Sequence, residues 1–476
     1  MAPDRRTLPD PRLATALLAA RATGGVIRRL GRGGGTAAPG LVADRIDPGM
    51  LGKIARQLPQ GSVVVAGTNG KTTVSRMLAD ILQASSFRVA HNRSGSNLVR
   101  GVASALAGQS DMLGRPAADI GVIESDEAAF PEIVRQVQPR LIVLNNLFRD
   151  QLDRYGELDA ISKSWQATLR LLPASTRVVV NLDDPTLAAI TEDLAAQRIG
   201  FGLDDPDPLL LLDALPHAAD AKVCRECGAD LQYDRLYSAH LGAWRCPQCG
   251  NARPTLSYAT TLVSLEGLEG VSLNVTPLAG PPVTARLAIP GLYNAYNATA
   301  AIAAARELDI APATIAVALA AYRSAFGRIE RVTYRDRPLT IALVKNPVGF
   351  NETLRMLTLA TSGLTTPTLI AINDLAADGR DVSWLWDVDF EMLADGSAPI
   401  STTGVRGTDL ANRLKYAGLP DSRIQPLPAD LAEALDAFVD TLPAGAAGYL
   451  LLTYTALLGL RQVLADRGAV AHFWEQ

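Results

Sequence analysis

The chain has 476 residues, which is enough for two or three domains. Hydrophobic residues make up 48% of it and charged residues 20%, a balance typical of a soluble globular enzyme. A net charge of −4 argues against general nucleic-acid binding, and no apolar run reaches the roughly 18 residues of a membrane span.

The first 60 residues are expected to form a helical segment. It should contain an alanine-rich helix over Leu13–Ile27, a glycine-rich loop at Gly31–Gly35 and a second helix over Pro48–Leu58. Arg21 interrupts the apolar stretch within this helix, which does not fit a signal peptide. We expect this helix to pack on the protein surface, and membrane contact is left open as an alternative. Without an export signal, a cytoplasmic location is expected.

From residue 61 onward, apolar runs alternate with helical patterns, which predicts a mostly parallel, doubly wound α/β sheet. Candidate strands of a first unit, 61–329, are Ser62–Ala66, Ile120–Glu124, Leu141–Leu144 and Arg177–Asn181. Its last part should add antiparallel strands at Thr260–Thr276 and helices at Tyr293–Leu308 and 312–322. A second unit, 330–476, has candidate strands at Thr340–Val344, Thr368–Asn373 and Gly448–Thr453. We therefore expect two α/β domains after the segment 1–60.

The strongest motif follows the first candidate strand. A turn of small residues, Gly67–Gly70, leads into Lys71–Thr73 at the start of a helical pattern. Backbone N–H groups of such a turn hold phosphate oxygens, a lysine neutralises them and a threonine hydroxyl reaches Mg²⁺. The turn is shorter than G-x-x-x-x-G-K-[ST], because Val65 stands where the first glycine is expected. The predicted ATP-binding residues of this loop are Gly67, Thr68, Asn69, Gly70, Lys71, Thr72 and Thr73.

Polar residues follow two further strands. Glu124 ends one of them, at the edge where nucleotide enzymes hold Mg²⁺, so Thr72 and Glu124 are candidate magnesium ligands and Lys71 and Glu124 candidate catalytic residues. The alternative is a solvated turn. The cluster Asn145–Glu157 follows Leu144. It is either an arginine–aspartate network that shapes a loop or a ligand-facing loop.

All four cysteines lie in two pairs, Cys224-x-x-Cys227 and Cys246-x-x-Cys249. Two such knuckles about eighteen residues apart fit a four-thiolate zinc ribbon, inserted at about 221–253. Disulfides are disfavoured in a reducing cytoplasm. Four thiolates leave no open position for water, so we expect the zinc to be structural rather than catalytic.

Four segments resemble, in order, the ATP-binding motifs of the Mur ligase family, which joins amino acids to peptidoglycan precursors. They are Gly67–Thr73, Asn146–Gly156, Gly291–Ala300 and Gly327–Glu330. The pattern Asn-Leu-x-Arg-Asp-x-Leu-Asp-x-x-Gly from Asn146 is the most diagnostic. The resemblance implies a central P-loop ATPase domain and a C-terminal Rossmann-like domain. It further implies nucleotide contacts by Asn297 and Arg328 and, on domain closure, by Lys345 and Asn346.

The chain departs from the family pattern in four ways. Its N-terminal region is too short for a UDP-precursor domain, and a cysteine ribbon interrupts the central domain. Gln151 replaces the usual histidine, which is a metal contact in the family. The lysine that is usually carbamylated would fall near Trp165, and Lys163 lies two positions away. We expect another residue, or water on the metal, to replace it.

These departures resemble one branch of the family, in which the ligase-like subunit works with a glutamine amidotransferase (GatD-like) as a heterodimer. Lys345–Glu352 and Asn373–Phe390 resemble signatures of that branch. The resemblance implies ATP-dependent activation of the α-carboxylate of D-glutamate in the lipid II stem peptide, at the inner face of the plasma membrane. Ammonia from the partner would then give D-isoglutamine. A stand-alone amino-acid ligase and a non-enzymatic ATP-binding assembly factor are the alternatives.

No cysteine lies outside the ribbon, so a thiol for glutamine hydrolysis must come from another chain. A Cys–His pair in the partner needs an acidic group to orient the histidine. We expect Asp387 to supply it in trans, with Asp381 and Asp389 as reserves. The alternative is a surface loop of solvated acids, in which Trp384 and Trp386 are interface or core aromatics.

Overall fold

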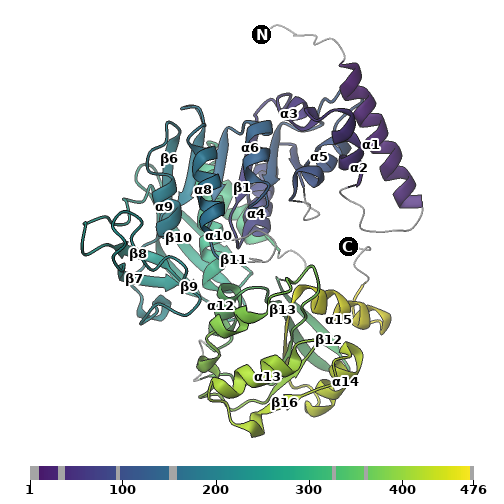
Figure 1. The fold of residues 1–476 in the computed structure, drawn as a ribbon, viewed down its shortest axis with the longest axis vertical. Helices are drawn as coiled ribbons and strands as arrows, with labels where there is room; N and C mark the ends of the chain where they lie inside the picture. Colours follow the sequence, from purple (N-terminus) through teal and green to yellow (C-terminus); the bar gives the residue numbers. More distant parts are fainter. Residues whose placement is uncertain are drawn as a thin grey trace.

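The computed structural model describes residues 10–29, 38–92, 97–149, 158–323, 328–358 and 363–471. Within these residues the chain forms two large β-sheets with helices packed on them and one small two-stranded sheet. Figure 1 shows the larger sheet and its helices in the upper part of the molecule and the second sheet below it. The expected α/β fold class is confirmed.

The larger sheet has nine strands, of which four match the candidate strands of the first unit. They are β1 (Ser62–Ala66), β2 (Val89–His91), β3 (Ile120–Glu124), β4 (Leu141–Leu144), β5 (Arg177–Asn181), β6 (Gln197–Leu203), β9 (Tyr258–Leu265), β10 (Val271–Pro277) and β11 (Val283–Leu287). Their order is β11-β10-β9-β6-β5-β4-β1-β3-β2. Strands β1 to β6 and β9 pair in parallel, and β10 pairs antiparallel with β9 and β11. The sheet is therefore mostly parallel, with the expected antiparallel part at one edge.

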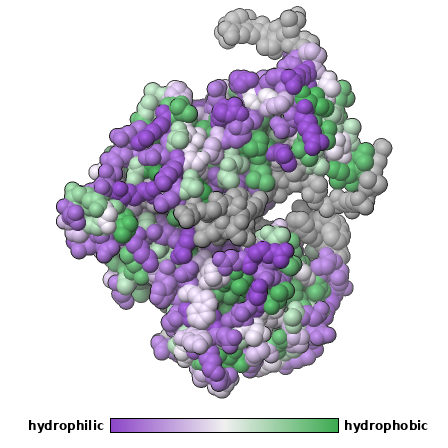
Figure 2. Space-filling view, in the orientation of Figure 1, coloured by the Kyte–Doolittle hydropathy of each residue, from purple (hydrophilic) through white to green (hydrophobic). Residues whose placement is uncertain are grey.

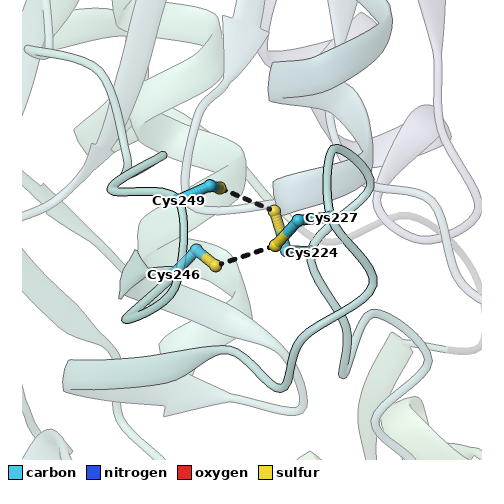
Figure 3. A group of neighbouring side chains, drawn as sticks. All are labelled: Cys224, Cys227, Cys246 and Cys249. Carbon is cyan, nitrogen blue, oxygen red and sulfur yellow. Dashed lines mark hydrogen bonds between the residues drawn. The ribbon is translucent and has the colours of Figure 1, made fainter.

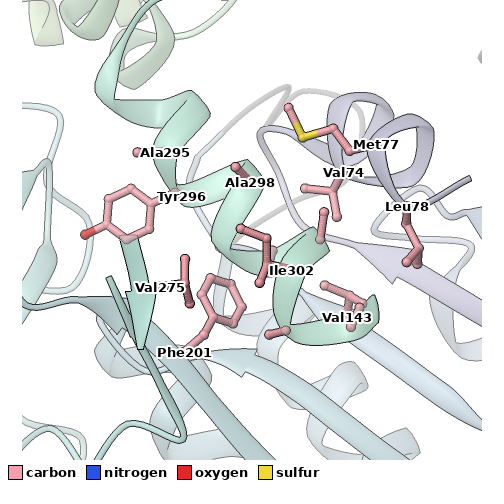
Figure 4. Packing of buried hydrophobic residues seen from close by; sticks show 14 of the residues in the cluster. Val74, Met77, Leu78, Val143, Phe201, Val275, Ala295, Tyr296, Ala298 and Ile302 are labelled. Atoms are coloured by element: carbon pink, nitrogen blue, oxygen red, sulfur yellow. The ribbon is translucent and has the colours of Figure 1, made fainter. Parts of the chain in front are cut away.

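Helices cover both faces of this sheet because both faces of its central strands are apolar. In β1, Val63 and Val65 point to one core and Val64 and Ala66 to the other. One face packs on α4 (Lys71–Ala84), α10 (Leu292–Arg306) and α11 (Pro312–Ala321). The other packs on α5 (Val99–Gly108), α6 (Phe130–Val137), α8 (Leu158–Leu169) and α9 (Pro185–Ile190). Figure 4 shows Ala298 and Ile302 of α10 among side chains of α4 and of the sheet.

The described residues of the N-terminal segment form three helices rather than the two expected. They are α1 (Pro11–Arg29), α2 (Ala38–Ile46) and α3 (Met50–Ala55). Leu13 and Leu17 are buried, so one face of α1 packs on the protein. The helix α2 was not expected because it contains Pro39 and Gly40. Gly40 fits there because it packs against α5: a Cβ atom would lie 2.0 Å from the carbonyl oxygen of Arg100.

The second sheet has six strands, three of which match the candidates of the second unit. They are β12 (Arg328–Tyr334), β13 (Arg337–Leu343), β14 (Thr368–Ala371), β15 (Ile400–Thr403), β16 (Ile424–Pro426) and β17 (Gly448–Leu452). Their order is β12-β13-β17-β14-β15-β16, and only β12 is antiparallel to its neighbour. The α-helices that follow its strands are α12 (Pro347–Thr358), α13 (Gly407–Tyr416), α14 (Leu431–Thr441) and α15 (Tyr454–Asp466).

The cysteine-rich segment forms part of the connection between β6 and β9, which are neighbours in the larger sheet. It contains the hairpin of β7 (Gln232–Ser238) and β8 (Leu241–Arg245), at the left of Figure 1. No described helix is both long and apolar enough to cross a membrane. Figure 2 shows one face of the molecule as mostly hydrophilic, with small hydrophobic areas over both halves.

Candidate active site

The phosphate loop connects β1 to α4 and depends on a glycine at the helix start. Gly70 precedes α4 with a φ of 85°, a left-handed conformation that glycine adopts without strain. A Cβ atom on Gly70 would lie 2.0 Å from Oδ1 of Asn297 and 2.5 Å from Nδ2 of Asn145. The loop therefore excludes any side chain at this position and brings Asn297, a predicted nucleotide contact, directly against it.

Asparagine side chains hold the shape of this loop. Nδ2 of Asn145 donates to the carbonyl oxygen of Asn69 at 2.8 Å and to Oδ1 of Asn297 at 3.0 Å. The backbone N–H of Asn69 donates to Oδ1 of Asn146 at 2.8 Å. Thr68 exchanges hydrogen bonds with the backbone of Phe148, at 2.9 and 3.0 Å. The segment after β4 is thus the support of the phosphate loop, although Asn145 was not among the predicted site residues.

Lys71 is buried beside a carboxylate that sequence reasoning did not single out. Its Nζ atom lies 3.1 Å from Oε1 of Glu127 and donates to the carbonyl oxygen of Thr68 at 2.9 Å. Both charged side chains are less than a tenth exposed. A buried charge of this kind requires a partner. The ammonium group is therefore held at the loop before any phosphate binds.

Thr72 and Glu124 lie together as expected from their places in the sequence. Oγ1 of Thr72 donates to Oε1 of Glu124 at 3.0 Å. Neighbouring oxygens around an octahedral Mg²⁺ lie about 3.0 Å apart, because each is about 2.1 Å from the ion. The pair therefore has the spacing of two adjacent magnesium ligands. Asn92 fixes the backbone of Glu124 through two hydrogen bonds of 2.9 Å.

The turn between β13 and α12 lies against the phosphate loop. Nδ2 of Asn346 donates to Oδ1 of Asn69 at 2.9 Å. A cleft of about 110 Å³ opens beside this contact, lined among others by Asn69, Asn297, Lys345 and Asn346. Arg328 is the first residue of β12, and its side chain is outside the described residues.

The place of the expected carbamylated lysine is filled by an aromatic ring. Trp165 is fully buried in α8, and its indole N–H donates to the carbonyl oxygen of Glu127 at 2.9 Å. Lys163 is exposed on the same helix. Gln151 and the rest of 150–157 are outside the described residues. Trp165 thus fixes the backbone of Glu127, whereas Lys163 lies outside the buried pair of Lys71 and Glu127.

The four cysteines converge on one point, as the sequence predicted (Figure 3). The sulfur atoms of Cys224 and Cys249 lie 3.6 Å apart, and those of Cys227 and Cys246 lie 3.4 Å apart. All four lie within 4.8 Å of one another. Tetrahedral zinc with Zn–S bonds of about 2.3 Å separates its sulfurs by about 3.8 Å. The cluster fits a structural metal site of this kind.

The ribbon also supports the loop beside the phosphate site. His240, fully buried in the turn of the ribbon hairpin, accepts hydrogen bonds from the backbone N–H groups of Asp220 and Ala221, at 3.1 and 3.3 Å. The carboxylate of Asp220 forms an ion pair with Arg149, and the ring of His240 packs 4.8 Å from that of Phe148. Sequence reasoning missed His240, because a lone histidine carries no signal of its role.

Comparisons with known proteins identify the family. The Mur ligase middle domain matches residues 65–223, and the MurT ligase C-terminal region matches residues 343–457. The MurT subunit of lipid II isoglutaminyl synthase (glutamine-hydrolyzing) from Streptococcus pneumoniae is 35% identical over 95% of this chain and 97% of its own. The subunit of the same name from Staphylococcus aureus strain COL is 32% identical over 80% and 83%. The chain belongs to the MurT family of Mur-type ligases.

Solved structures confirm the fold of this MurT family chain. A pseudomurein peptide ligase type C from Methanothermus fervidus aligns with a TM-score of 0.65 and 17% identity, over 85% of this chain and 78% of that chain. The folylpolyglutamate synthase of Mycobacterium tuberculosis complexed with ADP aligns with a TM-score of 0.59 and 16% identity, over 97% and 96%. At such identities the likeness establishes the Mur ligase fold alone.

The acid-rich segment Asp378–Asp389 places its three candidate acids differently. Asp387 lies 3.2 Å from Nη1 of Arg149, with its side chain about one-third exposed. Asp381 is exposed, and the hydrogen bonds that it accepts from Ser383 hold its pKa below the usual range. Asp389 accepts from Nδ2 of Asn351 at 2.5 Å, and burial raises its pKa. The first two are accessible from solvent, and Asp389 is half-buried.

Proposed function

We propose that this chain is the synthase subunit that amidates the α-carboxylate of D-glutamate in the lipid II stem peptide. The reaction consumes ATP and gives D-isoglutamine. The observation that carries the proposal is the match to MurT subunits over nearly the whole chain, together with the loop, lysine and acid cluster at the sheet edge. The alternatives are a stand-alone amino-acid ligase and an ATP-binding assembly factor.

A carboxylate is a poor electrophile, so the proposed first step is phosphorylation. A carboxylate oxygen attacks the γ-phosphorus of ATP, the bond to the ADP oxygen breaks, and an acyl phosphate forms. Lys71 would neutralise phosphate charge, the N-terminus of α4 would hold phosphate oxygens, and Thr72 and Glu124 would hold Mg²⁺, which would supply further charge neutralisation. Oδ1 of Asn145 is buried without a hydrogen-bond partner among the described residues. A buried polar atom of this kind is evidence that a ligand binds here and supplies the missing donor.

In the proposed second step, ammonia attacks the acyl carbon, the bond to the phosphate oxygen breaks, and a proton leaves. Asn297, Arg328, Lys345 and Asn346 are proposed nucleotide contacts. Residues 61–329 and 330–476 would act as two domains that close on the substrate, after an N-terminal segment 1–60. The contact between Asn69 and Asn346 supports such closure.

The source of ammonia is proposed to be a GatD-like glutamine amidotransferase bound to the second domain. The curated relatives are named as subunits of a glutamine-hydrolysing synthase. Next to Asp387, Trp386 is 53% exposed and packs against Tyr416, which is 77% exposed, with ring centroids 5.6 Å apart and the rings tilted by 57°. Exposed aromatic residues are enriched at protein interfaces. Asp387 would complete the partner's Cys–His pair, with Asp381 and Asp389 as the other candidates.

The function is tested with the complex purified from its native host. It is incubated with lipid II, ATP and glutamine, and the stem peptide is analysed by mass spectrometry. Amidation predicts the mass decrease that accompanies conversion of a carboxyl group to a carboxamide, together with release of ADP. A mass increase by an amino-acid residue would favour the stand-alone ligase, and ATP binding without ADP release would favour the assembly factor.

A further inference from the structure

Glu352 is a buried carboxyl group that has no role in the two steps of the proposed reaction. It lies in α12, within the segment Lys345–Glu352, and is 6% exposed. It lines the cleft beside the phosphate loop and also a second cavity of about 290 Å³. Glu352 and Val348 are the residues that the two linings share. The carboxyl group therefore stands where the two spaces meet.

The surroundings of Glu352 leave its charge without an ion pair in the described part of the chain. The hydroxyl group of Ser238, which lines the same cleft, opposes the burial effect by lowering the pKa of Glu352. The guanidinium of Arg355, one turn further along α12, donates to the carbonyl oxygens of Tyr237 at 2.6 Å and Leu209 at 3.2 Å. An ionised carboxylate in such a place favours the entry of a cation.

The second cavity connects Glu352 with the acid-rich segment. Asp389 and His217 line it, and the side chain of His217 is 69% exposed. One end of the cavity thus lies at the surface beside Asp389, which is two positions from Asp387 in the sequence. The other end lies at Glu352. Its position fits the entry of a small molecule released by a partner that binds beside Asp387.

We propose that Glu352 binds an ammonium ion that enters through the second cavity and removes one of its protons. This inference rests on the proposed function and names the residue that prepares its nucleophile. An N–H bond of ammonium breaks, its electron pair stays on nitrogen, and the proton moves to a carboxylate oxygen of Glu352. The ammonia formed passes into the cleft and attacks the acyl phosphate. Glu352 then returns its proton to water through the second cavity.

The electrostatics at this position suit a proton acceptor. Burial raises the pKa of Glu352, which brings it closer to neutral pH, where a general base is most effective. The charged or titratable groups that line these two spaces with it are Arg355 on its own helix, Asp389, His217 and Asp213 in the second cavity, and Lys345, Tyr293 and Tyr296 in the cleft. An ammonium ion bound at Glu352 would favour the ionised carboxylate.

The kinetic test uses the complex with lipid II, ATP and ammonium chloride in place of glutamine. We expect Glu352→Gln to lower kcat/KM for ammonium by about 10²-fold or more, with KM for ATP and glutamine hydrolysis unchanged. Glu352→Asp should recover part of the activity, and the exposed Glu433→Gln is the matched control. Wild-type kcat/KM for ammonium in Glu352→Gln would overturn the proposal.

Hydroxylamine separates proton removal from a structural role. It is already neutral at neutral pH and needs no base before it attacks. Glu352→Gln should therefore form the hydroxamate at nearly the wild-type rate while it fails with ammonium. Equal losses with both nucleophiles would show that Glu352 only shapes the cleft.

A binding measurement remains decisive even if lipid II is not amidated. Crystals of the wild-type complex are soaked in rubidium chloride, since Rb⁺ is close to ammonium in charge and size, and anomalous diffraction locates the ion. We expect a peak beside Glu352 that is absent in Glu352→Gln. No peak in the wild type would refute the cation site, whereas a peak without amidation would refute the proposed function alone.

Discussion

The side chain of Asn346 reaches across from the second sheet and donates a hydrogen bond to the side chain of Asn69 in the phosphate loop, at 2.9 Å. The two residues are 277 positions apart in the sequence. This contact places the start of α12 against the loop that is proposed to hold the phosphates. The relative position of the two sheets and the shape of the nucleotide site are therefore linked.

Replacing Asn346 by alanine removes this link. A single neutral hydrogen bond contributes about 1 kcal/mol, so Asn346→Ala should lower kcat/KM for ATP by about fivefold. Because Oδ1 of Asn346 also accepts from the backbone N–H of Gly349 at 2.8 Å, the thermal midpoint should fall slightly as well. Steady-state kinetics of ADP release measures the effect, with Asn274→Ala on β10 as a control far from the loop. Wild-type kinetics in Asn346→Ala would show that the contact between Asn346 and Asn69 does not contribute to ATP use.

Replacing Glu124 by glutamine tests the magnesium site. The amide keeps the shape and can still bond to Thr72, but it loses the negative charge that attracts Mg²⁺. We expect the Mg²⁺ concentration for half-maximal activity to rise by about tenfold or more. Thr72→Ser retains the hydroxyl group and should behave like the wild type. Identical magnesium titrations for Glu124→Gln and the wild type would contradict the assignment.

His240 should couple the ribbon to the nucleotide site. His240→Ala leaves the N–H groups of Asp220 and Ala221 without an acceptor, at a cost of about 2 kcal/mol, and should weaken ATP binding with the metal still bound. His240→Asn provides another acceptor and should lose less. Metal analysis and ATP titration by calorimetry measure both effects. Loss of the metal in His240→Ala would mean that the histidine supports the ribbon itself.

Asp387 is predicted to serve the partner's active site rather than this chain's own. In the complex, Asp387→Asn should lower glutamine hydrolysis by about 10⁴-fold, as expected for loss of the acid that orients a catalytic histidine. Amidation with added ammonium chloride should persist. Asp381→Asn and Asp389→Asn are measured beside it. Unchanged hydrolysis in Asp387→Asn, with a loss in either of the others, would move the assignment to that residue.

Asp183 and Arg253 provide a pH-dependent stability test. Nη1 of Arg253 lies 2.7 Å from Oδ1 of Asp183. Burial raises the pKa of Asp183, and the positive charge of Arg253 lowers it part of the way back toward its ordinary value. A raised folded-state pKa favours the protonated form, so its contribution to stability is lost as pH rises. Arg253→Met should destabilise the fold by about 3–5 kcal/mol near neutral pH and less in mild acid. Urea unfolding at both pH values measures this, and an equal loss at both would contradict it.

The central strands were predictable because buried parallel strands are continuous apolar runs. Short edge strands were not: β2 and β16 have three residues each, too few for a pattern. The phosphate loop, Glu124 and the four cysteines were predictable because residues close to them in the sequence form recognisable patterns. Glu127 and His240 have none, because their roles depend on partners that only the fold brings near, such as Lys71, which lies 56 positions away from Glu127.

The place of the ribbon in the connection between β6 and β9 also bears on how the chain folds. The last three strands of the larger sheet follow the ribbon in the sequence, and β9 joins the sheet beside β6. The connection must therefore close before this edge of the sheet can form, and closing a long free loop costs entropy. Metal-bound knuckles shorten the free part of that loop. Supply of the metal would then influence how fast a newly made chain completes its sheet, well before any nucleotide is bound.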